Sequence, residues 1–423
     1  MFRLHDNTRR QLCRLGFVLL CVVPVAVVVA ASLWLRTGHF NRMQARALSA
    51  ALDANVSVGS SHQVSPGATR YERVEVCDPE TGERLARAAT LSVERRGDSV
   101  VVLTPQITLY SSQALSRLCT TLERRLRMRD SRMRLRVAAG EVVLQWGGRV
   151  QKFAVPEVQL VPNAYGQYLA AHFHDSAADG SSRAKLEVWL DRRHTPHQAT
   201  YRIETGAAPL PCRLLASLWP PAGRLGGGCT FQGVLLAQEQ GDRWKGELAG
   251  SFADIDLDAL ITQQFPHELA GQGRANIQFA EFADSALTRC FGSLEAGPGQ
   301  ISPSLVHAAA KTLGAKASDI DSAGSLIAYD QLGLSFGLDR GVMQIRGNIS
   351  PHPGAILTAG HDTLLAEPAS RVQSVSNLIR VLEPLDQRTP VAASRGAARL
   401  VELLTPARAA PETVSSAPDP TRR

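Results

Sequence analysis

One uncharged apolar stretch near the N-terminus constrains this chain more than any other feature. It runs from Leu15 to Leu35 as LGFVLLCVVPVAVVVAASLWL and is flanked by Arg14 and Arg36. A helix rises about 1.5 Å per residue, so this stretch reaches about 30 Å, the thickness of the hydrocarbon core of a bilayer. The sequence therefore predicts a transmembrane helix at 15–35, preceded by a short cytoplasmic tail at 1–14.

A cleaved signal peptide is the alternative interpretation of the same stretch. Basic residues precede it, and Val29, Ala30 and Ala31 offer small side chains for cleavage. Signal peptides have apolar cores of roughly 7 to 15 residues, whereas this run continues past the cleavage point to Leu35. We favour a retained anchor. A short tail followed by a long domain favours export of the domain, since long domains cross largely regardless of charge.

Composition limits the classes of protein to consider. With 423 residues, 44% apolar and 20% charged, the chain can form one large or two ordinary domains with real cores. Its net charge of +7 would suit a nucleic acid or an acidic membrane surface. Much of the excess lies in 117–136 and in the C-terminal tail, and no recognition module accompanies it. We therefore expect no nucleic-acid partner.

The dominant spacing of apolar residues from Tyr71 onward is two, which is typical of β-hairpins. In one such run Leu186, Val188 and Leu190 face one way and the charged residues Lys185, Glu187 and Asp191 face the other, which predicts a sheet with one dry face. Helical spacing is confined to a few segments, including an amphipathic helix at 41–54, a helix at 112–129 and a helix capped by Ser302. The predicted fold class is mainly β with a few helices.

Proline and glycine interrupt the strand pattern between 206 and 228. We predict a connector there, between a first β-rich region at 36–205 and a second at 229–350. A helical segment is expected at 351–404. The tail at 405–423 is rich in Pro, Ala, Ser and Arg without apolar periodicity, so it is predicted to be disordered.

Two cysteines on either side of the connector form a candidate pair. No CxxC motif occurs, and the cysteine spacings match no zinc site. If the domain lies in an oxidising compartment, Cys212 and Cys229 are the pair we expect to form a disulfide, because the Pro- and Gly-rich segment between them is short enough to fold back. The alternative is that both are plain buried thiols.

Motifs of catalysis are not found in the sequence. It contains no GxGxxG fingerprint, Walker A sequence, HExxH motif or GxSxG elbow. His172, His174 and Asp175 have side chains that can bind a metal ion, but their spacing is that of residues on a strand edge. We interpret His194 and His197 as turn residues. We interpret the acidic run Asp254, Asp256, Asp258 as a helix N-terminus. We predict no catalytic, cofactor-binding or metal-binding residues, no cofactor and no enzymatic activity.

Three segments resemble a known family. The N-terminal stretch is followed by VSVGSSHQVSPGATRYERVEVCDPETGERLARAATLSVE, and later by WKGELAGSFADIDLDALITQQFPHELAGQGRANIQFAEF. A third segment, Tyr329 to Gly347, reads YDQLGLSFGLDRGVMQIRG. Together these segments resemble AsmA-like proteins, with a glycine-ended strand, a short "dL..L" helix and closing strands around a "G.l.i.G" turn.

The resemblance implies a single-pass bacterial inner-membrane protein with its bulk in the periplasm. Its fold would be a long curved antiparallel sheet, a groove or partial barrel, with an apolar concave side, and its role would be to move phospholipid or to assemble the envelope. About a dozen strands spaced roughly 4.8 Å apart would reach only about 60 Å, so bridging two membranes would require a protein partner or self-association.

We therefore expect a non-enzymatic protein that binds or helps to move phospholipid along an apolar groove in envelope homeostasis. The alternative is an assembly or scaffold protein that acts through protein contacts. The candidate lining of the groove is Leu186, Val188, Leu190, Tyr201 and Ile203.

Overall fold

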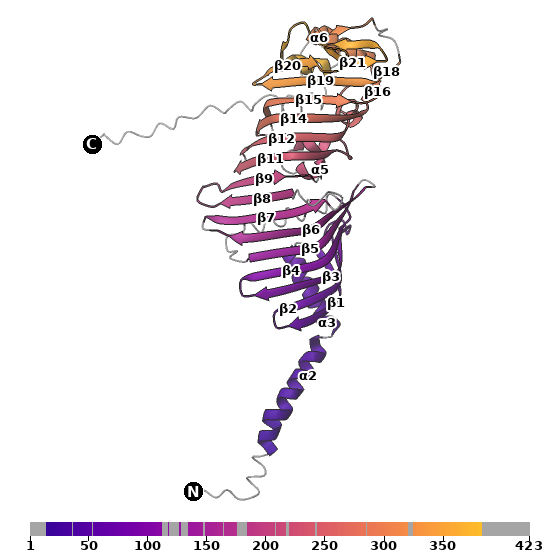
Figure 1. The fold of residues 1–423 in the computed structure, drawn as a ribbon. Helices are drawn as coiled ribbons and strands as arrows, with labels where there is room; N and C mark the ends of the chain where they lie inside the picture. The colour runs from indigo at the N-terminus through magenta and orange to yellow at the C-terminus, as the bar shows by residue number, and fades with distance from the viewer. Residues whose placement is uncertain are drawn as a thin grey trace, which may run out of the picture. The chain divides into compact units, whose positions relative to one another are not determined.

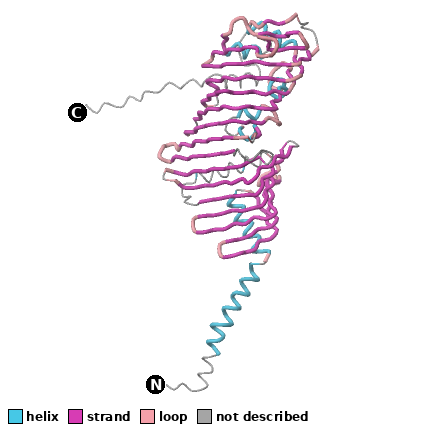
Figure 2. Tube along the Cα trace, viewed as in Figure 1, coloured by secondary structure: helices cyan, strands magenta, loops and turns pink. Residues whose placement is uncertain are grey.

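The computed structural model forms two compact units, residues 1–181 and 182–423 (Figure 1). It describes residues 14–111, 117, 127, 134–175, 184–319 and 325–382, apart from positions 36, 53, 147–148, 164, 208, 217–219, 242 and 285. Strands dominate both units (Figure 2). The predicted mainly β class with a few helices is thus confirmed.

Helical structure covers residues 14–35 at the N-terminal end. It consists of a first turn at 14–17, a π-helical turn η1 (Val18–Val22) and helix α2 (Val23–Leu35). Within the described residues, no helix meets both the length and the hydropathy needed to cross a bilayer. The transmembrane helix at 15–35 stays a prediction.

Helix α3 (Gly38–Leu52) confirms the amphipathic helix predicted at 41–54 and packs on the first two strands. Its polar side chains hold them by hydrogen bonds. The Tyr71 hydroxyl donates to Gln44 Oε1 at 2.9 Å, and the Val56 N–H donates to Ser49 Oγ, also at 2.9 Å. Both bonds satisfy polar groups that would otherwise be buried unpaired against the helix.

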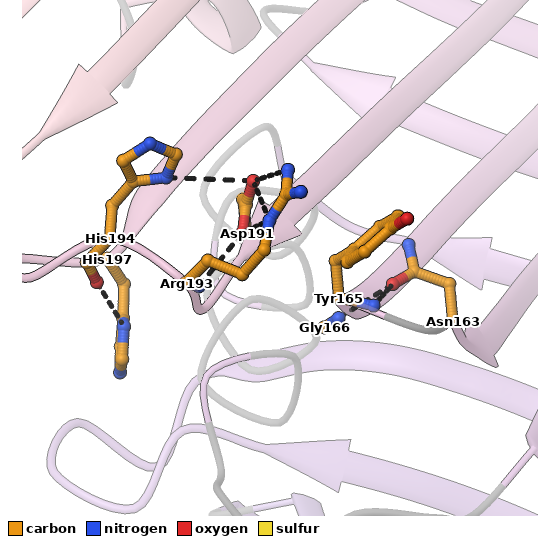
Figure 3. A network of polar contacts seen from close by, with 7 residues as sticks. All are labelled: Asn163, Tyr165, Gly166, Asp191, Arg193, His194 and His197. Atoms are coloured by element: carbon orange, nitrogen blue, oxygen red, sulfur yellow. Dashed lines mark hydrogen bonds and ion pairs between the residues drawn. The ribbon is translucent and has the colours of Figure 1, made fainter.

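The first unit contains strands β1 (Asn55–Ser65), β2 (Ala68–Cys77), β3 (Arg84–Arg96), β4 (Ser99–Leu109), β5 (Arg134–Trp146), β6 (Arg149–Pro162) and β7 (Gly166–Asp175). Adjacent strands pair as antiparallel hairpins at five of the six steps. In the turn between β6 and β7, Asn163 Oδ1 accepts the N–H groups of Tyr165 and Gly166 at 2.8 and 2.6 Å (Figure 3).

One pairing corrects the expectation of a wholly antiparallel sheet. Strands β4 and β5 are parallel, with Ser99 opposite Arg134 and Leu109 opposite Leu144. Parallel neighbours need a crossover of about a dozen residues or more, and residues 110–133 supply it. The helix predicted at 112–129 lies in this crossover, where Arg117 and Arg127 are helical and its other residues fall outside the described part.

The second unit is built on eight strands that pair in the order β8, β9, β11, β12, β14, β15, β19, β20, each antiparallel to the next. They are β8 (Ala184–Asp191), β9 (Gln198–Glu204), β11 (Thr230–Gln240), β12 (Arg243–Asp256), β14 (Gln272–Ala283), β15 (Ala286–Ala296), β19 (Gln331–Asp339) and β20 (Val342–Gly347). This order follows the chain, so most connections are short hairpins.

Shorter elements complete this unit. They are β10 (Leu210–Pro211), α5 (Cys212–Leu215), η2 (Pro220–Arg224), η3 (Asp258–Thr262), β13 (Leu269–Ala270), β16 (Gly299–Ile301), α6 (Pro303–Leu313), β17 (Lys316–Ala317), β18 (Ile327–Tyr329), β21 (Ala355–Ala359), β22 (Asp362–Ala366), β23 (Val372–Ser374) and α7 (Val375–Leu382). Strands β13, β16 and β18 form a small separate sheet. Helix α6 begins after Ser302 with Pro303 and ends at left-handed Gly314, at the predicted bounds, but the Ser302 side chain makes no cap hydrogen bond to the helix.

The predicted connector at 206–228 lies inside the second unit and does not separate two domains. Strand β9 pairs directly with β11 on the far side of it. Within it, Cys212, Leu215 and Ala222 are almost fully buried, so the segment packs as core. Its prolines and glycines therefore shape a compact turn-rich segment.

The segment predicted as helical at 351–404 also differs. Strands β21 and β22 form a hairpin around Gly360, and β23 leads into α7, the described helix of this segment. The apolar run Ala355–Ala359 pairs with β22 on one side and with β19 on the other. Pairing with these neighbouring strands, and not the local sequence, makes the run a strand. The rest of the predicted helical segment, residues 383–404, and the tail at 405–423 lie outside the described residues.

We expect Leu235→Ala to destabilise the second unit by roughly 2–5 kcal/mol, because Leu235 is completely buried in β11 and a cavity would remain. Val234→Ala is the matched control: its side chain is 41% exposed, and the expected change is about 0.5 kcal/mol or less. Hydrogen exchange of the β11 and β12 amides measures both. Equal losses of protection would contradict this assignment of the two faces of β11.

Candidate functional site

All five predicted lining residues lie on one face of the β8–β9 hairpin. Leu186 lies opposite Ile203, and Val188 lies opposite Tyr201. Leu190, two residues beyond Val188, points the same way because side chains alternate along a strand. The structure thus brings the five together from two adjacent strands.

Ile203 and Leu186 belong to a longer line of apolar side chains that crosses the sheet. At each step the next residue lies directly opposite the last, through all eight paired strands. We call this line the apolar row: Leu186, Ile203, Leu235, Leu248, Ala280, Cys290, Leu338 and Met343. With strands about 4.8 Å apart, it extends roughly 34 Å.

The opposite face carries a contrasting line one residue away on each strand. This polar row is Glu187, Arg202, Leu236, Glu247, Glu281, Arg289, Asp339 and Val342. Arg289 lies 3.8 Å from the Glu281 carboxylate and 3.4 Å from that of Asp339. Six of the eight members of the polar row are charged, whereas Leu236 and Val342 are apolar and exposed, so the contrast between the two faces is interrupted at β11 and β20.

The apolar row is shielded from solvent. Leu186 is half-buried, and the other seven members are between 0 and 7% exposed. Of the other predicted lining residues, Val188, Leu190 and Tyr201 are equally buried. An acyl chain would reach these side chains only where the protein atoms that cover them move aside.

Tyr201 is the one member of this predicted lining with a polar side-chain group, and it lies opposite Val188. Its hydroxyl donates to Glu239 Oε2 at 3.0 Å, and its ring stacks on Trp244 with centroids 5.4 Å apart. Both partners come from neighbouring strands, β11 and β12. The arrangement places an aromatic and a carboxylate beside the aliphatic side chains of the row.

Two surface depressions lie elsewhere. One of about 760 Å³ is lined by Phe291, Ser335 and Arg346 among others, and one of about 600 Å³ by Arg274 and Glu295 among others. Neither includes any of the five predicted lining residues. Their mixed polar linings do not suit an acyl chain.

The histidines and aspartates singled out from the sequence serve local structure. His172 lies opposite Glu157, whose pKa is lowered by a hydrogen bond from Gln159 and by Arg136. Asp256 Oδ1 accepts the N–H groups of Asp258 and Ala259 at the start of η3, as predicted, whereas Asp254 lies within β12 and away from this N-terminus. Among the described residues, no group of three or more His, Cys, Asp or Glu side chains is placed to hold a metal ion.

Sequence reasoning missed one serine–histidine contact. His267 Nδ1 lies 3.0 Å from Ser304 Oγ, although 37 residues separate them. Ser304 also bonds Ser302, whose hydroxyl accepts the Glu268 N–H at 3.2 Å. This chain of bonds ties the start of α6 to the segment before β13, which is a structural role. Nothing in the local sequence pattern pairs these residues.

Comparison of the chain with protein-family models, with curated proteins and with solved structures found no match in any of the three. The AsmA-like resemblance therefore rests on the three sequence segments that carry it.

Asp191 ends β8 and holds the turn of the hairpin that carries the lining residues (Figure 3). Its carboxylate binds the Arg193 guanidinium at 2.6 Å and accepts the Arg193 N–H at 2.9 Å, while His194 Nδ1 lies 3.6 Å away. In the same turn, His197 Nδ1 lies 3.2 Å from the His194 carbonyl oxygen. These contacts agree with a turn role for both histidines.

We expect the pKa of Asp191 to be about 2, lowered from 3.8 chiefly by the Arg193 side-chain hydrogen bond. Because the folded-state pKa is the lower one, this carboxylate stabilises the turn above pH 3.8, and its contribution is lost as the pH falls from 3.8 through 2. Arg193→Ala should raise the midpoint of the Asp191 carboxyl titration, followed by ¹³C NMR, toward 3.8. Arg192→Ala, which removes an equal neighbouring charge, is the control and should leave it near 2.

Proposed function

We propose that this chain is a membrane-anchored, non-enzymatic protein that binds phospholipid through the apolar row of its second unit. In this proposal the bulk of the chain lies in the periplasm of a bacterium, held to the inner membrane by residues 15–35. The role is to accept or pass on lipid in envelope homeostasis, and no cofactor is required.

The apolar row is the observation that carries the proposal. Eight strands contribute one apolar side chain each to the same face, without a charged residue between them. Its length of roughly 34 Å is about twice the thickness of one hydrocarbon leaflet, which is about 15 Å. An extended acyl chain would therefore fit along it. Binding would come from apolar contacts without directional chemistry, after the protein atoms that cover the row move aside.

The anchor is supported by its own side chains. Residues 14–35 are helical, and apolar side chains along them are exposed, for example Leu20 at 76% and Val25 at 63%. A helix whose apolar side chains face outward along its length is typical of one surrounded by lipid.

The AsmA-like resemblance supports the location and the substrate class. Members of that family are expected to expose a β-rich groove on the outer side of the inner membrane and to handle phospholipid. The one-sided sheet of the second unit supports the β-rich fold in that expectation, whereas its apolar row is covered by protein atoms and is not an exposed groove.

Lipid binding can be tested at two adjacent residues of β9. Replacing Tyr201 by p-azidophenylalanine nearly preserves its shape and places a photoreactive group on the lining. The same replacement of Arg202, which is exposed on the opposite face, is the matched control. After irradiation of membranes that contain the full chain, mass spectrometry should find phospholipid adducts on the 201 variant and not on the 202 variant. Adducts at neither position, or equally at both, would contradict lipid binding on this face.

An assembly or scaffold role is the second candidate function. Val234 and Leu236 are 41 and 40% exposed on the polar side of β11, where Ala249 of β12 lies opposite Val234. Exposed apolar side chains that are grouped on one face can contribute to a protein contact. A protein adduct from a photoreactive residue at Leu236, without lipid adducts at Tyr201, would favour this role.

Membrane attachment through residues 15–35 has a separate test. We expect the double variant Val25→Arg, Val27→Arg to leave the membrane fraction, since each arginine near the centre of a span costs roughly 2.5–3.5 kcal/mol. The variant Val25→Leu, Val27→Leu should stay in the membrane fraction. The mass of the intact wild-type chain distinguishes a retained anchor from a cleaved signal peptide. Equal sedimentation of both variants would contradict an anchor at this position.

A further inference from the structure

Cys212 and Cys229 are the two ends of the segment 212–229, and they lie side by side. Strands β10 and β11 pair with Leu210 opposite Phe231 and Pro211 opposite Thr230. Immediately beyond this ladder, where Cys212 begins helix α5, the Cys212 N–H donates to the Cys229 carbonyl oxygen at 2.9 Å. The backbone therefore holds the two residues directly opposite each other.

The two sulfur atoms touch within this frame. Cys212 Sγ and Cys229 Sγ are 2.6 Å apart, and the residues are 0 and 1% exposed. A disulfide bond is about 2.05 Å long and joins residues whose Cα atoms are roughly 4.4 to 6.8 Å apart, a separation that opposite residues of paired strands meet. Covalent closure needs only a small adjustment of the side chains.

Cys290 provides the contrast. It is also buried, on strand β15 within the apolar row, and burial raises the pKa of its thiol to about 12. A buried cysteine without a neighbouring thiol behaves as a small apolar side chain. Among the five cysteines that the structure describes, the sulfur–sulfur contact distinguishes Cys212 and Cys229.

We propose that Cys212 and Cys229 form a disulfide bond in the mature protein, closing the segment 212–229 against the start of β11. In the reaction, one thiolate attacks the disulfide of an oxidant, a thiol oxidase or a small-molecule disulfide, and releases one thiol. The second cysteine then displaces the oxidant's remaining sulfur. Two protons leave the cysteines, two electrons pass to the oxidant, and the oxidant is released as two thiols.

The bond would fix the segment that the sequence pattern marks as a connector. Leu215 and Ala222 are buried within it, and the Asp256 N–H donates to the Leu225 carbonyl at 3.0 Å. The segment thus contacts both β10 and β12, and the disulfide would link its two ends. Formation in cells rests on the proposed location outside the cytoplasm, since disulfides persist in oxidising compartments.

Peptide mapping tests the bond directly. The full chain is expressed with its N-terminal segment, its free thiols are blocked with N-ethylmaleimide during extraction, and it is digested with trypsin without reductant. Cleavage after Arg202, Arg213, Arg224 and Arg243 gives peptide 203–213 with Cys212 and peptide 225–243 with Cys229. We expect the two peptides to be linked, with a mass two hydrogens below their sum, and to separate on reduction. Cys290→Ala is the control and should leave the link unchanged.

A second experiment distinguishes whether the disulfide can form from whether the protein lies outside the cytoplasm. The chain purified under reducing conditions is incubated with oxidised glutathione and mapped in the same way. Linkage in both arms supports the proposal. Linkage only in the purified chain would overturn a disulfide in the mature protein and would count against the exported location as well. Two maleimide-modified peptides in both arms would overturn the bond alone, and the lipid test at Tyr201 would be unaffected.

Discussion

The second unit depends on keeping one register through eight strands. Side chains alternate with a period of two, so a slip of one residue would turn every side chain of a strand to the opposite face. Strand β14 shows how the register is kept. It has one more residue between Ile277 and Ala280 than either neighbour has over the same span, which is a β-bulge. Because of this bulge, Ile277 and Ala280 both lie opposite apolar or glycine residues of β12 and β15.

The sequence predicts the strands better than it predicts their partners. Alternation identifies the strands and the face that Leu186, Val188 and Leu190 share, and cap residues place helix α6. The parallel pair β4–β5 could not be predicted, because apolar residues alternate in the same way in parallel and in antiparallel strands. The crossover between the two strands determines their relative direction. The apolar row could not be predicted either. The sequence identifies each member as an apolar residue of its own strand, but the alignment of the members depends on the hairpin turns and on the bulge in β14.

At the connector, the sequence predicts the local structure correctly but the domain organisation incorrectly. Prolines and glycines between 206 and 228 indicate a break in the strands, and the strands do break there. They do not mark a domain boundary, because β9 and β11 pair across the break and Cys212, Leu215 and Ala222 of the segment between them are buried. The useful signal within it was the cysteine pair. Its short spacing indicated that the two residues could meet, and the structure places their sulfur atoms in contact.

The burial of the apolar row bears on how a lipid would bind under the proposed function. A row open to water would gain the full transfer free energy of the apolar area that a lipid covers, about 25 cal/mol per Å², and would release the lipid slowly. A row already covered by protein exchanges one apolar contact for another, so the net gain is small and binding is readily reversed. Weak, reversible binding suits a protein that passes lipid on. A length of roughly 34 Å also limits the row to a step of about one lipid, so longer transfer would require a partner or further copies of the chain.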